Sequence, residues 1–527
     1  MTVLTRRTIV KYFVASGAFL PALGSVTAEA VKPQQQPQPA PLPKFSFEDV
    51  TRRARELASA EFDHNAPVLP EALDKLDFDA WRDIRFRPEK ALFAANGSQF
   101  RLQLFHLGFL YRRPVTVNVI RDGIASPVPY TSALFDYGRT KFDKPLPVNL
   151  GFAGFRLHYP LNSPKVFDEV VAFLGASYFR FLGRGQRYGM SARALAVEAG
   201  TPNEEFPFFR EFWIETPDPG AEQAAIYGLV DSPSVTGAYR FDLYPGVETA
   251  IEVSAMLFPR KSDVKFGLAP LTSMFFIGGN DHRFNDDYRF ELHDSGGLLV
   301  HSGTGEWIWR PLRNPVKPDV SAFLNSNIRG FGLLQRDRDF GHYQDLDLAY
   351  ETRPSYFVEP RGNWGEGRVE LVELPTDHEA NDNIVTSFVP KAPLEPGKPF
   401  SYAYRLSATL DSGPLSPNGR ALSTYQTKAR ALGSAEPELP GSRRFIIDFA
   451  GGDLAYYLPS PDLVEVVPST SAGSIVRSFI VPNPHTKGFR AVIDVQLEPG
   501  KSADLRAFLR TGSRALTETW TFPWRPQ

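Results

Sequence analysis

The chain contains no cysteine among its 527 residues. Disulfides, thiolate nucleophiles and cysteine-based zinc sites are therefore excluded, and stability must rest on core packing. Basic residues (58) and acidic residues (60) nearly balance, so the formal net charge of −2 gives no electrostatic attraction for nucleic acid. No stretch approaches the roughly 18 consecutive apolar residues of a membrane helix, so we expect no membrane span in the mature protein.

Signatures of several enzyme classes are also missing. There is no G-x-S-x-G nucleophile elbow, and "PGKS" at 499–502 lacks the upstream glycine of a phosphate loop. "HEAND" at 378–382 lacks the second histidine of a zinc protease, and the nine histidines are scattered. The sequence therefore predicts neither a metal nor a cofactor.

The N-terminus has the layout of a cleaved export signal. Arg6 and Arg7 precede a short apolar stretch, and small residues follow at Ala28 and Ala30. The arginine pair resembles a twin-arginine signal, with an ordinary secretory signal as the alternative. We therefore expect a signal peptide at 1–30, an extended Pro/Gln-rich tether at 31–44, and a periplasmic mature protein.

Hydrophobic content of 42% and charged content of 22% are typical of a globular protein. Ser46 and Asp49 form a capping-box pattern that predicts a helix, and a second short helix is expected within 71–84. From about residue 95, short aromatic and β-branched segments alternate with turn residues, which predicts an antiparallel β-sandwich. One amphipathic helix is expected to interrupt it at 163–175.

Two β domains are expected along the chain. The first would cover residues 45–389, and the Pro/Gly-rich stretch 390–399 is typical of a linker. The strands expected in 400–527 would make a domain of the size of an immunoglobulin-like sandwich. The predicted fold class is therefore all-β, with a large sandwich followed by a small one.

Aromatic, carboxylate, amide and arginine side chains gather in 291–312, 329–367 and 375–385. Aromatic rings can stack on sugar rings while arginine, aspartate and asparagine bind hydroxyl groups, so this mixture favours a neutral polysaccharide. Core packing is the alternative for each aromatic residue, Trp309 included. The candidate substrate-binding residues are His293, Trp307, Arg310, Glu359, Arg361, Trp364 and Asn383.

Hydrolysis of a glycosidic bond needs a protonated carboxyl as acid and a base that activates water. Asp294, in "HDSGG", and Asp382, in "NDNIV", both lie where a predicted strand meets a loop. Composition alone does not prefer them to the other carboxylates of this region, which are Asp337, Asp339, Asp345 and Glu359.

Longer stretches carry a family resemblance. They include "AFLGASYFR" (172–180), "YGMSARALA" (188–196), "EFPFFREFW" (205–213), "LAPLTSMFF" (268–276), "GFGLLQRDRDFGHYQD", "RPSYFVEPRGNWGEG" and "NDNIV". With these motifs the chain resembles the periplasmic glucan biosynthesis proteins OpgG and OpgD, also called MdoG and MdoD, from about residue 45 to 520. The twin-arginine pattern makes it more similar to the OpgD type.

The resemblance implies a mutarotase-like large domain, a small immunoglobulin-like domain, and action on β-1,2-glucan by an inverting endo-β-1,2-glucanase. It also implies that Asp382 is the general acid, that Asp294 is the general base acting through a relay of waters, and that Tyr350 positions substrate and relay. The glycine pair after Ser295 departs from the family pattern, so hydrolysis and transglycosylation both stay open. A non-catalytic glucan-binding module, an enzyme for another polysaccharide, and a homodimer also stay open.

Overall fold

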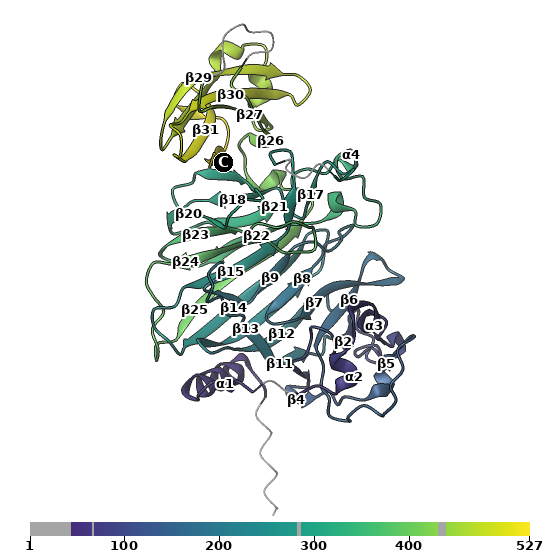
Figure 1. The fold of residues 1–527 in the computed structure, drawn as a ribbon. Helices are drawn as coiled ribbons and strands as arrows, with labels where there is room; N and C mark the ends of the chain where they lie inside the picture. Colours follow the sequence, from purple (N-terminus) through teal and green to yellow (C-terminus); the bar gives the residue numbers. More distant parts are fainter. Residues whose placement is uncertain (1–43, 66–67, 282–285, 431–438, 527) are drawn as a thin grey trace, which may run out of the picture. The chain divides into compact units, whose positions relative to one another are not determined.

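The computed structural model describes residues 44–526, except 66–67, 282–285 and 431–438. The expected signal peptide at 1–30 and nearly all of the tether at 31–44 lie outside these residues. Strands dominate the described part, which confirms the predicted all-β class (Figure 1). Among the described helices, none has the length and apolar character needed to cross a membrane.

Two large sheets form most of the protein. In spatial order, the first contains β2 (Arg101–Phe105), β6 (Gly154–Ser163), β7 (Val166–Leu174), β8 (Tyr178–Phe181), β9 (Ser191–Arg193), β15 (Phe266–Ser273), β24 (Ile384–Pro390), β23 (Glu366–Glu373) and β20 (Asp319–Ser326), with β10 (Leu195–Val197) also paired to β15. The second contains β28 (Glu465–Thr470), β31 (Ala503–Thr511), β33 (Thr519–Trp524), β19 (Trp307–Pro311), β18 (Gly297–His301), β21 (Gly330–Leu334), β22 (Ser355–Arg361), β25 (Phe400–Thr409), β14 (Thr249–Pro259), β13 (Val235–Tyr244), β12 (Ala224–Asp231), β11 (Phe208–Glu215), β3 (Thr116–Arg121) and β4 (Ile124–Pro127), with β32 (Arg514–Ala515) paired to β31.

The main core lies between these sheets, and alternation along the strands decides which side chains enter it. In β6, Phe155 and Leu157 are buried while Arg156 and His158 point to the other face. The Phe155 ring meets Phe212 of the opposite sheet, with ring centroids 4.9 Å apart. Each such buried ring contributes about 1.5–3 kcal/mol of transfer free energy.

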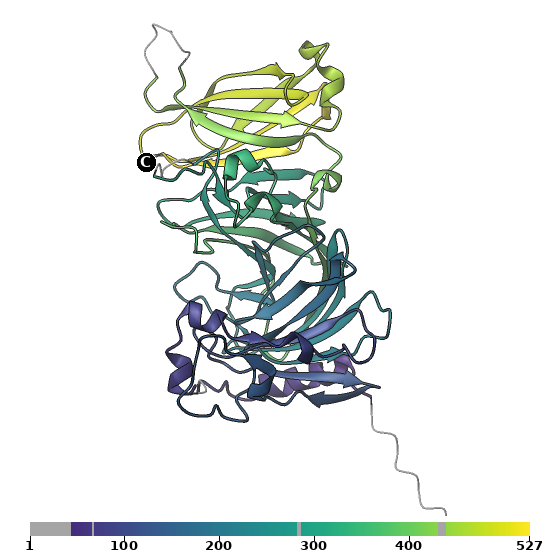
Figure 2. The ribbon, with the colours of Figure 1, turned by 90° about the vertical axis from the view of Figure 1, so that its right-hand side faces the viewer.

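A four-stranded sheet packs against the end of the fifteen-stranded one (Figure 2), and a second core lies between them. The four strands are β26 (Arg420–Thr427), β27 (Ser442–Ala450), β30 (Gly488–Gln496) and β29 (Ser474–Asn483). Phe445 of β27 packs on Trp520 and Phe522 of β33, whose rings stack at an interplanar angle of 4°. Two ribbons, β1 (Arg85–Phe86) with β5 (Phe135–Asp136) and β16 (Phe275–Ile277) with β17 (Leu292–His293), complete the strands of the described part.

The predicted helix after Ser46 is confirmed as α1 (Phe47–Ser59), which begins with the Ser46–Asp49 capping box and packs on β12 and β13. The helix expected within 71–84 is present as two short helices, α2 (Glu71–Asp74) and α3 (Phe78–Arg82). The remaining described helices are α4 (Phe340–Tyr343), α5 (Leu454–Tyr457) and the 3-10 turns η1 (Pro88–Lys90), η2 (Ser132–Leu134), η3 (Tyr350–Thr352), η4 (Gly413–Leu415) and η5 (Pro461–Leu463).

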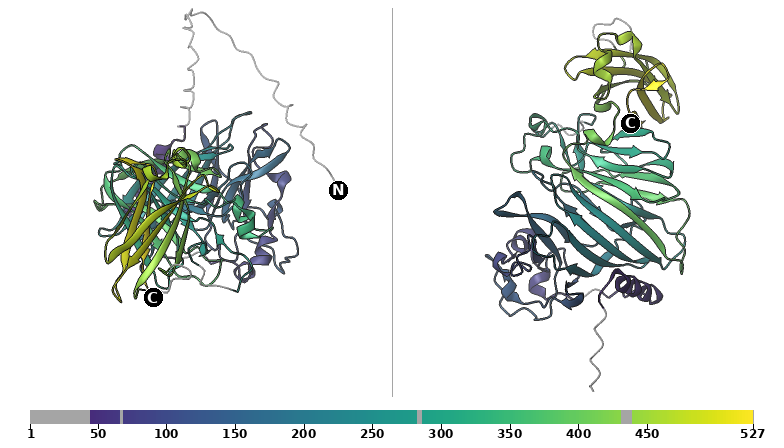
Figure 3. Two further views of the ribbon diagram at one scale, coloured as in Figure 1. Left: turned by 90° about the horizontal axis from the view of Figure 1, so that it is seen from above. Right: turned by 180° about the vertical axis from the view of Figure 1, so that it is seen from behind.

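Two expectations about the chain's organisation are wrong in detail. Residues 163–175 do not form a helix: they form the end of β6 and strand β7, which pairs with β6 on one side and β8 on the other. Strand β25, at 400–409, does not begin a second domain, because it lies between β14 and β22 in the large sheet (Figures 1 and 3). The large sandwich therefore extends past the linker expected at 390–399.

Candidate active site

The loop between β23 and β24 carries Asp382, and hydrogen bonds hold this loop in a defined hairpin. The Leu374 N–H donates to the Asn383 carbonyl across its base, at 2.8 Å. The Asn314 side chain accepts from the Thr376 N–H at 2.9 Å and donates to the Thr376 carbonyl at 2.8 Å. Asp382 is therefore presented by a fixed segment.

Asn383 joins this hairpin to the segment that carries Asp294. Its Oδ1 accepts from the Phe275 N–H at 2.8 Å, and its Nδ2 donates to the Phe275 carbonyl at 3.0 Å. Phe275 pairs with His293, the residue before Asp294, and the Asp294 N–H donates to the Met274 carbonyl at 2.9 Å. The segments that carry both candidate carboxylates are thus anchored to the same short stretch, Met274 and Phe275, at the start of β16.

Asp294 is held by a buried arginine that also contacts Tyr350. Arg353 Nη1 donates to Asp294 Oδ1, and the Arg353 guanidinium carbon lies 3.8 Å from the centroid of the Tyr350 ring. The side chain of Asp294 is only 5% exposed. Burial raises the pKa of Tyr350 above its usual value, and nearby carboxylates raise it further, so its phenol remains a donor.

The carboxyl of Asp382 is in a different electrostatic position. Burial raises the pKa of this carboxyl above its ordinary value, and the negative charge of Asp294 raises it further. The positive charges of Arg180, Arg353 and Arg193 act in the opposite direction without cancelling the effect. Asp382 is an exposed residue of the loop, so solvent screens part of this effect.

Glu379 is a member of the site that the sequence did not single out. Tyr350 Oη donates to Glu379 Oε2 at 3.1 Å, and Arg289 Nη1 forms an ion pair with the same oxygen at 3.0 Å. Arg289 also pairs with Asp345 at 2.8 Å. Glu379 shares its loop with Asp382, but its partners are about 30 and 90 residues distant in sequence, so no local pattern indicated them.

His293 and Asn383, expected to bind substrate, support the site from inside the protein. His293 is 2% exposed, and its Nε2 lies 2.6 Å from Glu291 Oε2. Its ring stacks on Phe275 with centroids 5.2 Å apart. Asn383 is buried, and its side chain forms hydrogen bonds with backbone groups.

The other five candidate substrate-binding residues are not brought to the two carboxylates. Trp307 belongs to the second core, and Trp364 belongs to the main core, where its Nε1 donates to the Ala403 carbonyl at 3.1 Å. Arg310 is 1% exposed and pairs with Glu373 at 2.6 Å. These three side chains have structural roles.

Glu359 and Arg361, on β22, lie in a separate charged group on that strand. Arg361 forms an ion pair with Glu252 at 2.9 Å, and the charge of Glu359 helps to raise the pKa of Arg361. Among the described contacts, none links either residue to Asp294 or Asp382.

The remaining carboxylates of the sequence cluster also have structural partners. Asp339 caps α4 by accepting from the Gly341 N–H, and Asp337 Oδ2 lies 2.5 Å from His342 Nδ1. Among the described residues, one group could offer ligand atoms to a metal. Its ligand atoms lie within 4.8 Å of one another and belong to Glu291, Asp337 and His342. Each of the three side chains already has a protein partner, so the grouping does not support a metal site.

Taken together, the site contains one carboxyl whose pKa is raised and a second that accepts a hydrogen bond from an arginine. A phenol and a third carboxylate lie next to this pair. Such a division of two carboxyls between acid and acceptor is the arrangement that acid–base chemistry on an acetal requires.

Comparison with known families matches residues 45–524 to the model described as "Periplasmic glucan biosynthesis protein, MdoG". The chain belongs to the MdoG family. This confirms the resemblance that the sequence motifs indicated.

Relatives with two different names are similar over nearly the whole chain. The "Probable glucans biosynthesis protein D" of Shewanella oneidensis is 43% identical, over 92% of this chain and 89% of the relative. The "Glucans biosynthesis protein G" of Ralstonia nicotianae is also 43% identical, over 91% and 95% respectively. The same-named protein of Pseudomonas aeruginosa is 41% identical, over 92% and 93%. Because D-type and G-type relatives are equally similar, the closer likeness to the OpgD type stays a prediction.

Proposed function

We propose that this protein acts in periplasmic glucan biosynthesis as an inverting endo-β-1,2-glucanase or a related transglycosylase. Asp382 is the general acid, Asp294 is the general base, and Tyr350 helps to position the substrate and the attacking water. Family membership supports the biosynthetic role and a periplasmic location, reached through the twin-arginine-type signal at 1–30.

The observation that carries the proposal is the difference in environment between the two anchored carboxyls, Asp382 and Asp294. Burial and the charge of Asp294 raise the pKa of Asp382, which is the direction that a leaving-group acid requires. Asp294 is nearly enclosed, and the family resemblance implies that it acts on the attacking water through a relay of waters. A relay also lets the carboxyls lie farther apart than the roughly 6.5–9.5 Å of ordinary inverting enzymes.

The decisive experiment is product analysis on linear β-1,2-glucan, with the anomeric configuration followed by NMR. We expect new reducing ends of inverted configuration, and we expect Asp382→Asn to lower the rate about 10²–10⁴-fold while glucan binding persists. Asp377→Asn is the matched control, because Asp377 lies in the same loop with its side chain 86% exposed. Cleavage that survived in Asp382→Asn would contradict the residue assignment.

The same assay separates the proposal from its alternatives. Glucan affinity with no reducing ends after long incubation would identify a non-catalytic binding module. Products longer than the substrate would identify transglycosylation, and cleavage of β-1,3- or β-1,4-glucan in preference to β-1,2-glucan would identify another polysaccharide as the substrate. Sedimentation of the full chain would test the homodimer.

A further inference from the structure

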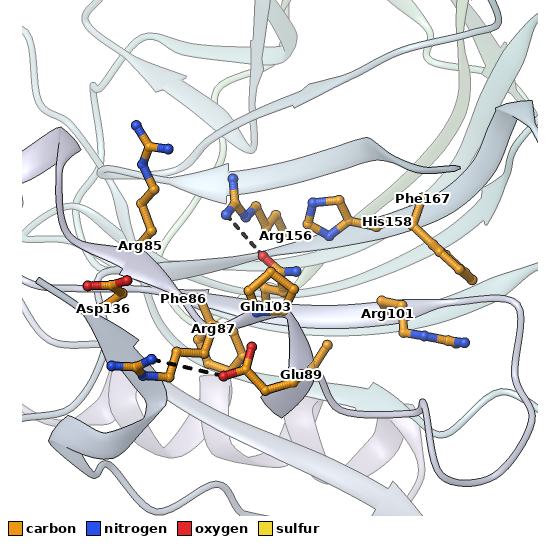
Figure 4. Close-up of a pocket in the computed structure, with 12 residues that line it drawn as sticks. Arg85, Phe86, Arg87, Glu89, Arg101, Gln103, Asp136, Arg156, His158 and Phe167 are labelled. Atoms are coloured by element: carbon orange, nitrogen blue, oxygen red, sulfur yellow. Dashed lines mark hydrogen bonds and ion pairs between the residues drawn. The ribbon is translucent and has the colours of Figure 1, made fainter. Parts of the chain in front are cut away.

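A pocket of about 510 Å³ opens where the β1–β5 ribbon meets the β2 edge of the ten-stranded sheet (Figure 4). We call it the arginine pocket, and its lining residues are Arg85, Phe86, Arg87, Pro88, Glu89, Ala91, Arg101, Gln103, Asp136, Arg156, His158 and Phe167. This volume suits a small organic molecule rather than a single ion.

Positive charge exceeds negative charge in this lining. Four arginines face two carboxylates, Glu89 and Asp136. Arg85 and Arg87 lie on the stretch that joins β1 to η1, Arg101 lies on β2 and Arg156 lies on β6, so three backbone segments converge on one space (Figure 4). Charge collected in a concave space focuses the potential and favours an anionic ligand.

The arginines differ in how firmly the protein already holds them. Arg101 donates to the carbonyls of Ser98 and Phe100 and lies over the Phe167 ring, 4.2 Å from its centroid. Arg87 and Glu89 are 4.0 Å apart, at the outer limit for an ion pair. In the part of the chain that the structure describes, Arg85 makes no ion pair, although Asp136 is its partner in the β1–β5 register.

Two buried polar atoms at the pocket also lack partners within the described structure. Arg156 donates through Nη1 to Glu169 at 2.9 Å and through Nη2 to Gln103 at 3.0 Å, but its buried Nε has none. The buried Nδ1 of His158 has none either. Buried polar atoms are usually satisfied, so these two show that polar side chains beneath the pocket are incompletely paired; because both atoms are enclosed, a ligand would meet the outer parts of these side chains.

The arginine pocket is separate from the catalytic carboxylates. It lies at β2 and β6, and five strand-to-strand steps through β7, β8, β9 and β15 separate β6 from β24. At about 4.8 Å per step, this distance is roughly 24 Å. The pocket and the site around Asp382 share no residue.

We propose that the arginine pocket binds a small molecule through an oxyanion, either a phosphate or a carboxylate group. Arg85 and Arg156 supply charged donors, and a guanidinium matches the geometry of both oxyanions. His158 is neutral near pH 7, because burial lowers its pKa to about 4, and it adds a ring nitrogen without adding charge. Glu89 and Asp136 can accept hydrogen bonds from hydroxyl groups on the same ligand.

The test is titration calorimetry of the full chain with sodium phosphate and, separately, sodium acetate, against sodium chloride at equal ionic strength. We expect saturable binding of at least one oxyanion. Arg85→Ala should weaken it about tenfold, the usual effect of losing one charge-assisted hydrogen bond. Tighter phosphate binding identifies a phosphorylated ligand, and tighter acetate binding identifies a carboxylate.

The matched control is Arg121→Ala, because Arg121 is exposed at the end of β3 and lies outside the pocket. Arg85 is also exposed, so neither substitution removes a buried contact. Binding should be unchanged in Arg121→Ala. Absence of saturable binding for both oxyanions, or equal weakening in the two variants, would overturn the proposal. Neither outcome depends on glucan cleavage.

Discussion

Two buried arginine–carboxylate pairs in this protein have the same chemistry but different surroundings. Arg310 and Glu373 are each 1% exposed in the interior, and Glu373 also accepts from the Arg313 N–H at 2.8 Å and from its guanidinium at 3.2 Å. Arg353 and Asp294 form the other pair, beside the Tyr350 ring and the carboxyl of Asp382.

The difference lies in the balance of charge around each pair. Donors from two arginines satisfy Glu373, as expected of a pair with a structural role. At the site, Arg353 forms an ion pair with Asp294, while the second carboxyl, Asp382, makes no ion pair among the described contacts and has a raised pKa. Perturbed carboxyls of this kind are typical of catalytic sites, whereas balanced buried pairs are structural.

The largest effect on catalysis is expected when Asp294, the carboxylate of the Arg353–Asp294 pair, is neutralised. Asp294→Asn keeps the size of the side chain but removes the proton acceptor, so we expect the rate of glucan cleavage to fall about 10²–10⁴-fold. The measurement is the initial rate of reducing-end formation under saturating glucan. Retention of more than a tenth of the rate would show that another group is the base.

The same change in the interior pair should affect stability instead. Glu373→Gln leaves Arg310 buried without a counter-charge, so we expect the free energy of unfolding to fall by about 3–5 kcal/mol. The rate per folded molecule should be unchanged. Urea unfolding followed by tryptophan fluorescence measures the first quantity, and the glucan assay measures the second. A loss of rate per folded molecule would contradict the structural role assigned to the Arg310–Glu373 pair.

A smaller effect is expected when Arg353 is displaced without any change of charge. A Cβ at Gly189 would lie 2.7 Å from the Cδ of Arg353, so Gly189→Ala should push the guanidinium away from Asp294. Misplacement of about 1 Å in a site can cost up to about 10²-fold in rate, and we expect between tenfold and that limit. Gly296→Ala is the control, since its Cβ would meet no atom closer than 3.7 Å.

Local patterns in the sequence predicted local structure well. The Ser46–Asp49 capping box is present at α1 because every group it needs lies within four residues. The helix expected at 163–175 failed because the residues that decide its conformation lie on β6 and β8, and pairing on both sides outweighs helical spacing.

Prediction of the site depended on the same distinction. Composition pointed to the region that contains Asp294 and Asp382 but did not assign roles. It could not separate core tryptophans from surface ones, and Trp307 and Trp364 are enclosed by strands distant in sequence. The roles of Asp294 and Asp382 came from the family resemblance and remain a proposal. Glu379 was missed because its partners, Tyr350 and Arg289, are brought to it only by the fold.

The smallest effect expected is on the pH dependence of stability. Burial raises the pKa of Asp382 above the ordinary value of 3.8, so the folded protein binds this proton more tightly than the unfolded chain does. Its favourable contribution is therefore fully present below pH 3.8 and is lost as the pH rises through the raised pKa of the folded state. Asp382→Asn should then be more stable than the wild type at pH 7, by less than about 1 kcal/mol because solvent reaches the residue and screens the effect.

This gain should disappear as the pH falls toward 4, and thermal unfolding of both proteins from pH 4 to 8 measures it. Asp377→Asn should show no such trend, because Asp377 is largely exposed. A difference that stayed constant with pH, or a loss of stability in Asp382→Asn at pH 7, would place Asp382 with balanced carboxylates such as Glu373. The contrast between the two pairs would then rest on Arg353 alone.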